Sequence, residues 1–234
     1  MTAVSLRGVG KAYGDKDAAT FAALRDVDLD VETGEFLILT GRSGCGKTTL
    51  LNIASGLATP TSGSVKVEGV DLWSISDAER SNLRNRTMGF VFQFPSLLPG
   101  LTLAQNVTLP LEFSAEEHAD AAGRARELLE TVGLGHRADA LPRELSAGQQ
   151  QRVVVARSLI NRPTLLLADE PSSDLDQDTE AEIMEIFSRI HREQGITIIM
   201  ATHARNLISF GTRHLEMADG TLRPDGVAAA GNGD

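Results

Sequence analysis

Four short apolar runs stand out along the chain, at 36–40, 88–92, 164–168 and 196–201. Each run is nearly continuous instead of alternating, which indicates a strand buried on both faces of a sheet. Several of the intervening segments repeat apolar residues at helical spacing and predict amphipathic helices. We expect these helices at 48–57, 116–132, 146–160 and 178–192. The alternation of strands and helices predicts an α/β fold with a mainly parallel sheet.

The N-terminal part of the chain has a looser pattern. Within 24–31, apolar residues alternate with Asp28 and Asp30, and a similar segment covers 4–9. Strands that alternate in this way commonly belong to antiparallel sheets with one face packed on the core. These segments therefore predict an N-terminal antiparallel β subdomain at the edge of the main sheet.

The remaining segments complete the expected domain organisation. Residues 71–145 are mostly helical in pattern and predict a helical subdomain between two blocks of strands. The small and polar residues of 224–234 predict a flexible tail. We expect one domain over 1–223.

Composition and charge narrow the class of protein. The 234 residues are 41% apolar and 23% charged, which is typical of a folded globular chain. A single cysteine, Cys45, excludes an intrachain disulfide framework and fits a reducing compartment. No stretch approaches the roughly 20 apolar residues that a membrane span needs, and the start lacks the apolar core of a signal peptide. A net charge of −10 without a basic stripe argues against nucleic-acid binding, so we expect a cytosolic protein without a nucleic-acid partner.

The segment GRSGCGKT, at 41–48, follows the first apolar run directly and opens a predicted helix. In this context the loop and the helix N-terminus present backbone N–H groups to phosphate oxygens. Lys47 is expected to reach the β and γ phosphates, and the Thr48 hydroxyl to bind Mg²⁺. The alternative is a glycine-rich turn with a chance lysine, which arises in on the order of a percent of chains of this length.

Polar side chains follow each of the other buried strands. They are Gln93 after the second run, Asp169 and Glu170 after the third, and His203 after the fourth. In a parallel sheet these strand ends lie along one edge, where α/β proteins bind ligands. Each residue alone has an ordinary explanation as a loop or capping residue. Their coincidence with the phosphate loop favours a shared site.

The charge and reach of these side chains suggest their roles. Asp169 suits a Mg²⁺ contact through water, because this cation prefers carboxylate and water oxygens. Glu170 can address the attacking water as a general base. His203 can hold the γ-phosphate and that water in line, and Gln93 is long enough to touch the metal or the water.

Together these motifs resemble the nucleotide-binding subunits of ATP-binding cassette proteins, over nearly the whole chain. Walker A is GRSGCGKT, the Q-loop is VFQF around Gln93, the signature is LSAGQQQR, Walker B is TLLLADEP, the D-loop is SSDLD and the switch is His203. The resemblance implies a P-loop NTPase core that binds Mg-ATP and hydrolyses it to ADP and phosphate. Tyr13 matches the aromatic position that stacks on adenine, although a tyrosine packed on the N-terminal sheet is the alternative.

The resemblance thus implies three groups of residues. Catalysis is expected from Glu170, His203 and Gln93, and metal binding from Thr48, Gln93 and Asp169. The residues expected to bind ATP are Tyr13, Gly41, Arg42, Ser43, Gly44, Cys45, Gly46, Lys47, Thr48 and Thr49.

The signature opens the predicted helix at 146–160. Ser146 alone could be an ordinary N-cap. A helix tip carrying Ser146, Gly148 and Gln149 is also a second anion site, and a P-loop leaves the outer face of the γ-phosphate open. Two copies facing head to tail would close each other's sites, as the resemblance also implies for Ser146, Ala147, Gly148 and Gln149 and for Asp176 of the D-loop. We expect a homodimer or a paired cassette with ATP between the subunits.

The family resemblance also implies partners. In the family, the Q-loop and the helical subdomain pass movement to integral-membrane permease subunits, which places the cassette on the inner face of the cell membrane. The sequence around Gln93 resembles the subgroup that serves lipoprotein release, macrolide export and cell division.

Two positions depart from the family pattern. Ala147 stands where the signature usually has glycine, and a methyl group costs about 1 kcal/mol or more if that position needs a positive φ. Asp174 lies in the D-loop where small or amide residues are commoner, and it adds negative charge near the expected dimer interface.

Other functions fit the same sequence less well. A GTPase of the usual kind needs an Asn-Lys-x-Asp motif, which the chain lacks, and the segment 50–144 has no coiled coil of the kind found in DNA-repair cassettes. A non-transport cassette ATPase remains an alternative, although such proteins usually fuse two nucleotide domains. An ATP-dependent clamp that regulates a membrane partner without turnover is a further alternative, and Glu170 with His203 argues against it.

Overall fold

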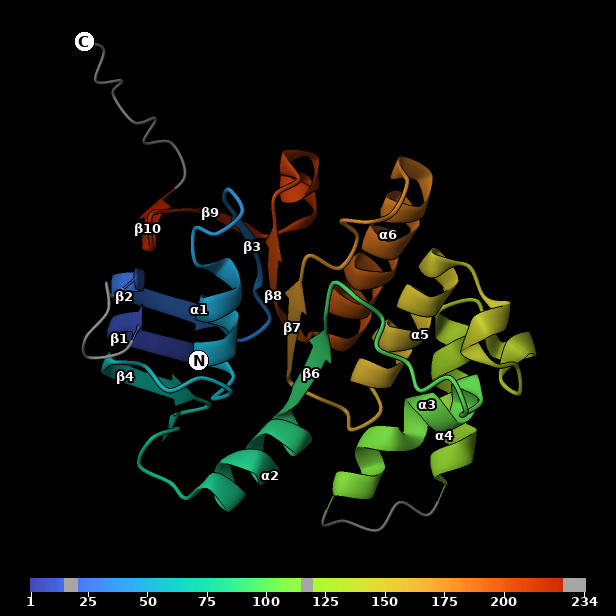
Figure 1. Ribbon diagram of the computed structural model, residues 1–234. Helices are drawn as coiled ribbons and strands as arrows, with labels where there is room; N and C mark the ends of the chain where they lie inside the picture. The colour runs from blue at the N-terminus through green and yellow to red at the C-terminus, as the bar shows by residue number, and fades with distance from the viewer. Residues whose placement is uncertain (15–20, 115–119, 225–234) are drawn as a thin grey trace.

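The four buried apolar runs form four neighbouring strands of a six-stranded sheet in the computed structural model, which describes residues 1–14, 21–114 and 120–224 (Figure 1). The sheet has the order β10-β9-β3-β8-β7-β6. Its strands are β3 (Phe36–Thr40), β6 (Met88–Val91), β7 (Leu165–Asp169), β8 (Thr197–Thr202), β9 (Arg213–Ala218) and β10 (Thr221–Pro224). Neighbouring strands from β9 to β6 are parallel, and only β10 pairs antiparallel. The predicted α/β fold with a mainly parallel sheet is confirmed.

Both faces of the central strands are covered, which explains their continuous apolar sequences. Along β3, Ile38 packs in one core and Leu37 and Leu39 in the other. The first core lies against α5 (Ala147–Ser158) and α6 (Gln177–Gln194), and the second lies against α1 (Lys47–Ala54). Because successive side chains of a strand point to opposite faces, a strand covered on both sides has no polar face.

The N-terminal strands form a separate sheet. Strands β1 (Thr2–Tyr13), β2 (Phe21–Glu32), β4 (Ser62–Val67) and β5 (Val70–Asp71) pair antiparallel in the order β2-β1-β4-β5. The predicted antiparallel subdomain is therefore present, but the expectation that it extends the edge of the main sheet was wrong. Its apolar face packs instead into the core that contains α1 (Figure 1). Register shifts near Gly8, which has φ 56°, interrupt the alternation of β1 and explain the looser pattern.

The helical residues between the strand blocks form two groups. Helix α2 (Asp77–Thr87) precedes β6 directly, and α3 (Leu103–Thr108) and α4 (Ala121–Thr131) pack on α5. Short 3₁₀ segments complete the region: η1 (Leu109–Phe113), η2 (Gly135–Arg137), η3 (Pro142–Glu144) and, near the C-terminus, η4 (Arg205–Phe210). Strand β6 thus divides the interval 71–145, and the group of helices around α3 and α4 lies beyond it (Figure 1).

The start of α4 differs from the predicted start because an N-cap residue sets it. Asp120 is the N-cap of α4, because its carboxylate accepts a hydrogen bond from the Gly123 N–H at 3.0 Å. This helix therefore begins at Ala121 instead of 116, and residues 115–119 lie outside the described residues, as does the predicted tail from residue 225 onward. In the described part of the chain, no helix is long and apolar enough to span a bilayer.

Close packing of α5 on β6 gives a test of the fold. A Cβ atom at Gly89 would lie 2.2 Å from the Ser158 carbonyl oxygen and 2.5 Å from Leu166 Cδ2. We predict that Gly89→Ala lowers the free energy of unfolding by about 1–3 kcal/mol, because the backbone of α5 must shift. Urea denaturation measures this change. The control is Gly100→Ala, where a Cβ meets nothing within 4 Å, and equal stability of the two variants would contradict the packing.

Candidate active site

The phosphate loop connects β3 to α1 through turns that only glycine can make. A Cβ at Gly41 would lie 2.4 Å from the Met217 carbonyl oxygen, and one at Gly46 would lie 2.5 Å from the Ala23 carbonyl oxygen. Gly46 is the residue before α1 and has φ 114°. The two glycines let the loop lie against neighbouring backbone, so that the loop ends at the N-terminus of α1.

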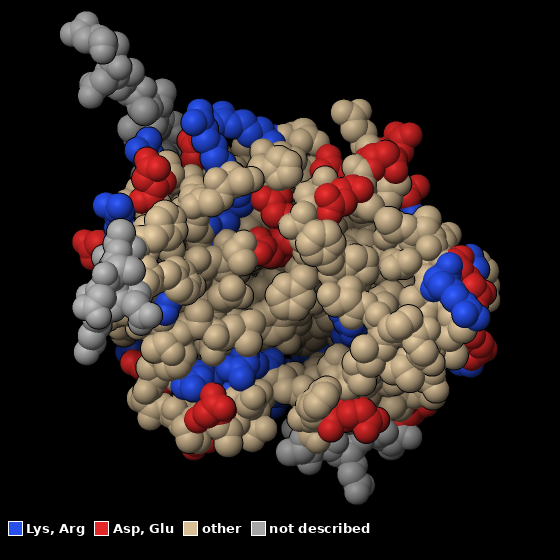
Figure 2. Space-filling model, viewed as in Figure 1, with Lys and Arg blue, Asp and Glu red and all other residues tan. Residues whose placement is uncertain are grey.

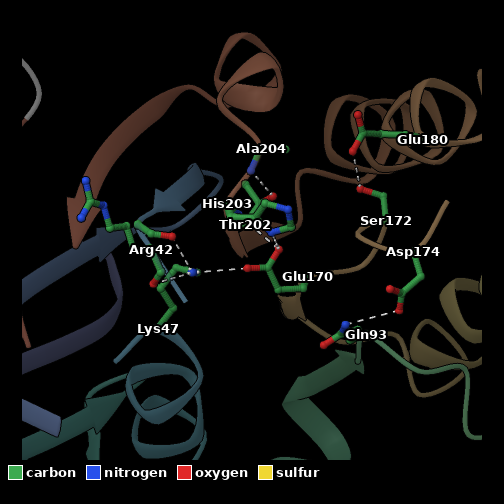
Figure 3. A network of polar contacts seen from close by, with 11 residues as sticks. Arg42, Lys47, Gln93, Glu170, Ser172, Asp174, Glu180, Thr202, His203 and Ala204 are labelled. Atoms are coloured by element: carbon green, nitrogen blue, oxygen red, sulfur yellow. Dashed lines mark hydrogen bonds and ion pairs between the residues drawn. The ribbon is translucent and has the colours of Figure 1, made fainter. Parts of the chain in front are cut away.

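Lys47 lies inside this loop with only 5% of its surface exposed. Its ammonium donates a hydrogen bond to the Gly41 carbonyl oxygen at 2.8 Å and lies 3.3 Å from Glu170 Oε1 (Figure 3). A buried ammonium requires such partners, because its transfer from water is otherwise strongly unfavourable. The contacts hold the charge of Lys47 at the mouth of the loop, where a phosphate oxygen could bind it.

Glu170 connects the phosphate loop to the neighbouring strand end. Its second carboxylate oxygen accepts a hydrogen bond from the His203 N–H at 3.2 Å and lies 2.8 Å from His203 Nδ1. The backbone of Glu170 has φ 48°, and its N–H donates to the Ala201 carbonyl oxygen at 2.8 Å. This left-handed conformation is uncommon for glutamate and is typical of functional sites. It is a feature that the sequence pattern did not predict.

Asp169 lies beside Thr48 at the end of β7, and both line a small adjacent pocket. Its Oδ1 atom is buried and has no hydrogen-bond partner among the described residues. Burial raises the pKa of Asp169, while the Thr48 hydroxyl and the Lys47 charge act in the opposite direction. A carboxylate oxygen without a partner next to a hydroxyl fits Mg²⁺, which takes oxygen ligands and keeps several of its waters.

Gln93 comes to the same edge of the sheet. Its side-chain amide donates a hydrogen bond to Asp174 Oδ2 at 3.3 Å (Figure 3). The sequence marks Asp174 as a departure from the family pattern but does not predict this contact. Asp174 therefore lies within reach of the residue expected to touch the metal or the water.

Lys47, Gln93 and Glu170 line a pocket of about 330 Å³, whereas His203 and Asp169 are not in its described lining. Its lining combines the phosphate loop with the hairpin of β1 and β2: Tyr13, Phe21, Ala23, Ser43, Gly44, Gly46, Lys47, Thr48, Thr49, Gln93 and Glu170. Of the residues expected to bind ATP, Gly41, Arg42 and Cys45 are absent from this described lining. Phe21 is a candidate that sequence reasoning missed. It pairs with Tyr13 across the hairpin, and both rings are exposed, at 61% and 46%.

The signature residues lie away from this pocket. Ser146 caps α5 by accepting a hydrogen bond from the Gln149 N–H at 3.3 Å, and the Gln149 side chain accepts one from the Ser146 N–H at 3.1 Å. This reciprocal capping box explains why an amide follows three residues after the serine. None of the signature residues 146–149 is found in the described lining of the pocket. Within one chain, the two anion-binding features therefore do not meet.

The two small residues of the signature have different constraints. Ala147 is the first residue of α5 and is not among the described residues with positive φ. The backbone strain that a methyl group would cause at a positive φ is therefore absent at this position. A Cβ at Gly148 would lie 2.2 Å from Thr179 Cγ2. The same Thr179 donates its hydroxyl to Asp176 Oδ2 at 2.7 Å. Asp176 is thus the N-cap of α6, and the D-loop and the signature meet at Thr179.

Asp176 has an ordinary structural role in the chain. Its Oδ1 accepts a hydrogen bond from the Thr179 N–H at 3.0 Å, and this bond, with that from the Thr179 hydroxyl, lowers the pKa of Asp176. A role at a dimer interface is an additional expectation for this residue.

Comparison with known proteins identifies relatives of this arrangement. The model of the ABC transporter family matches residues 24–173. The lipoprotein-releasing system ATP-binding protein LolD of Geobacter metallireducens is 45% identical over 215 residues, which cover 92% of this chain and 95% of that protein. The macrolide export ATP-binding/permease protein MacB of Syntrophobacter fumaroxidans is 41% identical over 97% of this chain, which spans 32% of that longer protein.

Solved structures agree with these relatives. The ATP-binding cassette MJ0796, in a dimeric post-hydrolysis state bound to ADP and Pi, superimposes with a TM-score of 0.85. It is 37% identical, and the match covers 94% of this chain and 98% of that one. The cassette cbiO1 of Clostridium perfringens, part of the transporter complex cbiONQ, has a TM-score of 0.84 at 27% identity, over 95% of this chain and 87% of that one.

Substitution of Asp169 by asparagine should affect stability and metal binding in opposite directions. The raised pKa of Asp169 gives the direction of the stability effect. The folded chain holds this proton more tightly than the unfolded chain, so ionisation destabilises the fold above the raised pKa. This destabilisation disappears as the pH falls toward the unfolded value. We predict that Asp169→Asn raises the free energy of unfolding at about pH 8 and that the difference from the parent shrinks toward about pH 4.

Urea denaturation in a chelator, at both pH values, measures the stability effect. The same variant should need more Mg²⁺ for ATP turnover, because an amide replaces the charged oxygen. A variant that is less stable than the parent at the higher pH would contradict the unpartnered, buried state of the Asp169 carboxylate.

Proposed function

Because the chain belongs to the ABC transporter family, we propose that it is the ATP-hydrolysing subunit of a transporter whose membrane-spanning permease is formed by other chains. One observation carries this proposal. Parallel strand ends bring Glu170 into contact with both Lys47 and His203 beside a pocket that the phosphate loop lines. The similarity to a cassette dimer that holds ADP and Pi supports ATP hydrolysis as the reaction.

Each side chain has a part in the reaction that its position supports. A phosphate oxygen in the pocket competes with Glu170 for the Lys47 ammonium, which frees the Glu170 carboxylate to accept a proton from water. The water oxygen then bonds to the γ-phosphorus while the bond to the β–γ bridging oxygen breaks, giving ADP and phosphate. His203 holds the Glu170 carboxylate in place through its 2.8 Å contact. Thr48, Asp169 and Gln93 would hold Mg²⁺, which would supply positive charge to the phosphates when bound.

The separation of the signature from the pocket supports a shared site. Ser146 and the tip of α5 point a helix N-terminus outward, and such an end attracts anions. Two copies arranged head to tail place this tip on the γ-phosphate held by the other copy. ATP then joins the subunits, and loss of the γ-phosphate removes the contact that joins them.

A glutamine variant tests both the reaction and the shared site. Glu170→Gln removes the proton acceptor while keeping the shape of the side chain. We predict that ATP binding is retained, that turnover falls by about 10²–10⁴-fold, and that the ATP-bound dimer lives longer. Phosphate release and size-exclusion chromatography with Mg-ATP measure these effects.

The matched control is Glu68→Gln. Glu68 contacts Thr164 at the opposite edge of the main sheet, so the same loss of charge there should leave turnover unchanged. Normal hydrolysis by Glu170→Gln would remove Glu170 from its role, and an ATP-loaded monomer that hydrolyses normally would remove the shared site.

A second surface suits the permease. A groove of about 450 Å³ lies between α2, β6, η1 and the end of α5, and its lining is mainly apolar and includes Phe90, Phe92, Leu109 and Phe113. Phe113 is 73% exposed, Phe94 at the end of the Q-loop is 66% exposed, and Leu98 beyond it is 45% exposed. Figure 2 shows a hollow near the centre of this face of the molecule, with uncharged residues around most of it. Exposed large apolar groups that gather in this way mark interaction sites.

We assign this groove to a cytoplasmic segment of the permease. It adjoins Gln93, so a partner seated there could sense the nucleotide site through the Q-loop. The relatives named for lipoprotein release and macrolide export support a permease of that type. The cassette would then lie at the inner face of the cell membrane, with the helical subdomain, about 71–145, toward the permease.

Substitution in the groove tests the partner. Phe113→Ser should weaken capture of the membrane permease by about tenfold or more, because exposed aromatic side chains often dominate binding. Basal ATP turnover should not change, since Phe113 lies outside the nucleotide pocket. Affinity capture from solubilised membranes, followed by sequencing of the captured membrane protein, measures this effect.

Leu57→Ser is the control, because Leu57 is also exposed, at 51%, but does not line the groove. Equal loss of capture in both variants would contradict docking at the groove, and capture of no membrane protein by the parent chain would contradict the transporter assignment.

A further inference from the structure

The signature helix is hydrogen-bonded to the backbone on both sides of Gln93. Gln151 Nε2 donates to the Phe92 carbonyl oxygen at 3.0 Å. Two turns further along α5, the Arg157 guanidinium donates to the carbonyl oxygens of Pro95 at 3.1 Å and Ser96 at 3.0 Å. The segment that carries Gln93 is thus attached to α5 at each end, although it is separated from this helix by about 60 residues of chain.

The Gln151 bond lies in the protein interior. The side chain is only 2% exposed, and its Oε1 atom is buried without a hydrogen-bond partner among the described residues. A buried amide with one unsatisfied atom stabilises a fold less than an apolar side chain of similar shape does. Packing alone would therefore favour methionine or leucine at this position, which suggests that the bond to Phe92 serves another purpose.

Arg157 strengthens the attachment from the other side. It forms no ion pair with a described carboxylate, and burial lowers the pKa of its guanidinium. Its donors are directed to main-chain oxygens, so they fix the position of the backbone after Gln93 instead of neutralising a charge. Phe92 and Pro95 are therefore held by one rigid element, and Gln93 lies between them.

We propose that Gln151 is a positioning residue for the ATPase reaction, which sets the place of Gln93 by holding the Phe92 carbonyl oxygen. The proposal rests on the role assigned to Gln93 at the metal or the attacking water. Gln93 itself is exposed, and among the described residues its amide has only the 3.3 Å hydrogen bond to Asp174. Its backbone thus needs an anchor if the side chain is to reach the same place in each turnover.

The position of Gln151 on α5 gives the anchor a second consequence. Ser146, at the tip of the same helix, lies about 7.5 Å away along the axis, because an α-helix rises about 1.5 Å per residue. The Q-loop of one nucleotide site and the signature offered to the partner's site are therefore attached to one helix. A displacement of the Q-loop by the permease would move both.

Neighbouring Gln150 provides a matched control. Its Nε2 also donates to main-chain oxygens, at 3.1 Å to Pro142 and 3.3 Å to Leu145, but these residues precede the same helix and do not belong to the Q-loop. Substitution of Gln150 removes the same kind of bond without releasing Phe92.

A double-mutant cycle between positions 151 and 93 tests the proposal. The purified full chain is assayed for phosphate release over a range of Mg-ATP concentrations up to saturation, as Gln151→Met, Gln93→Ala and the double variant. We expect Gln151→Met to lower kcat about tenfold while KM for ATP changes less than about twofold, because small displacements of a reacting group slow chemistry more than binding. In the Gln93→Ala background, the same substitution should change kcat less than about twofold. Gln150→Met should leave kcat near the parent value in both backgrounds.

The outcomes separate this proposal from the function on which it rests. If Gln93→Ala slows turnover but Gln151→Met slows it by the same factor in both backgrounds, Gln93 keeps its role and the positioning role of Gln151 is overturned. If Gln93→Ala has no effect, both assignments fail. Thermal unfolding of Gln151→Met, and of Gln151→Leu as a second variant, should occur within about 4 °C of the parent. Unfolding of both at the assay temperature would make Gln151 a structural residue and overturn the proposal.

Discussion

The enclosed positive charge of Lys47 is the constraint on which the rest of the site depends. Burial of an ammonium is tolerated only with close oxygen partners, and the structure supplies them from the loop and from Glu170. To reach Lys47, Glu170 adopts an uncommon backbone conformation, which the hydrogen bond to Ala201 maintains. His203 then holds the other oxygen of the same carboxylate. One buried charge therefore orders the ends of three parallel strands.

That arrangement leaves the outer face of the pocket incomplete. The features that could cover it belong to α5, whose capped N-terminus lies outside the described pocket lining. The capping box fixes the direction of this helix end, and the contact between Gly148 and Thr179 fixes its position against α6 and the D-loop. A chain built in this way would present a rigid second half-site to another copy, so the proposed head-to-tail pair needs no flexible closing segment.

Much of this could be predicted from the sequence because the signals were local. Continuous apolar runs gave the buried strands, and the phosphate loop with the polar strand ends gave the residues around Lys47. The N-terminal antiparallel subdomain was predicted, but its separation from the main sheet was not, because bulges near Gly8 blur the alternation that would define its faces. The contacts of Gln93 with Asp174 and of Gln151 with Phe92 join residues 81 and 59 positions apart, and no periodicity encodes such pairs. Phe21 was not predicted either, because its place beside Tyr13 depends on the pairing of β1 with β2 and not on a local sequence signal.

Three locally unfavourable features of the described chain lie at or near the site, although others lie elsewhere. Asp169 has a buried oxygen without a partner, Glu170 has a left-handed backbone, and Gln151 has a buried unsatisfied amide oxygen. Each lowers the stability of the fold relative to an unremarkable residue, so a role in function accounts for them better than stability does. They lie at the expected metal site, at the proposed proton acceptor and at the proposed anchor of the Q-loop. Their distribution connects the nucleotide pocket, through β7 and the Q-loop, to the helix that carries the signature, which is the path that a transporter subunit needs between ATP and its partners.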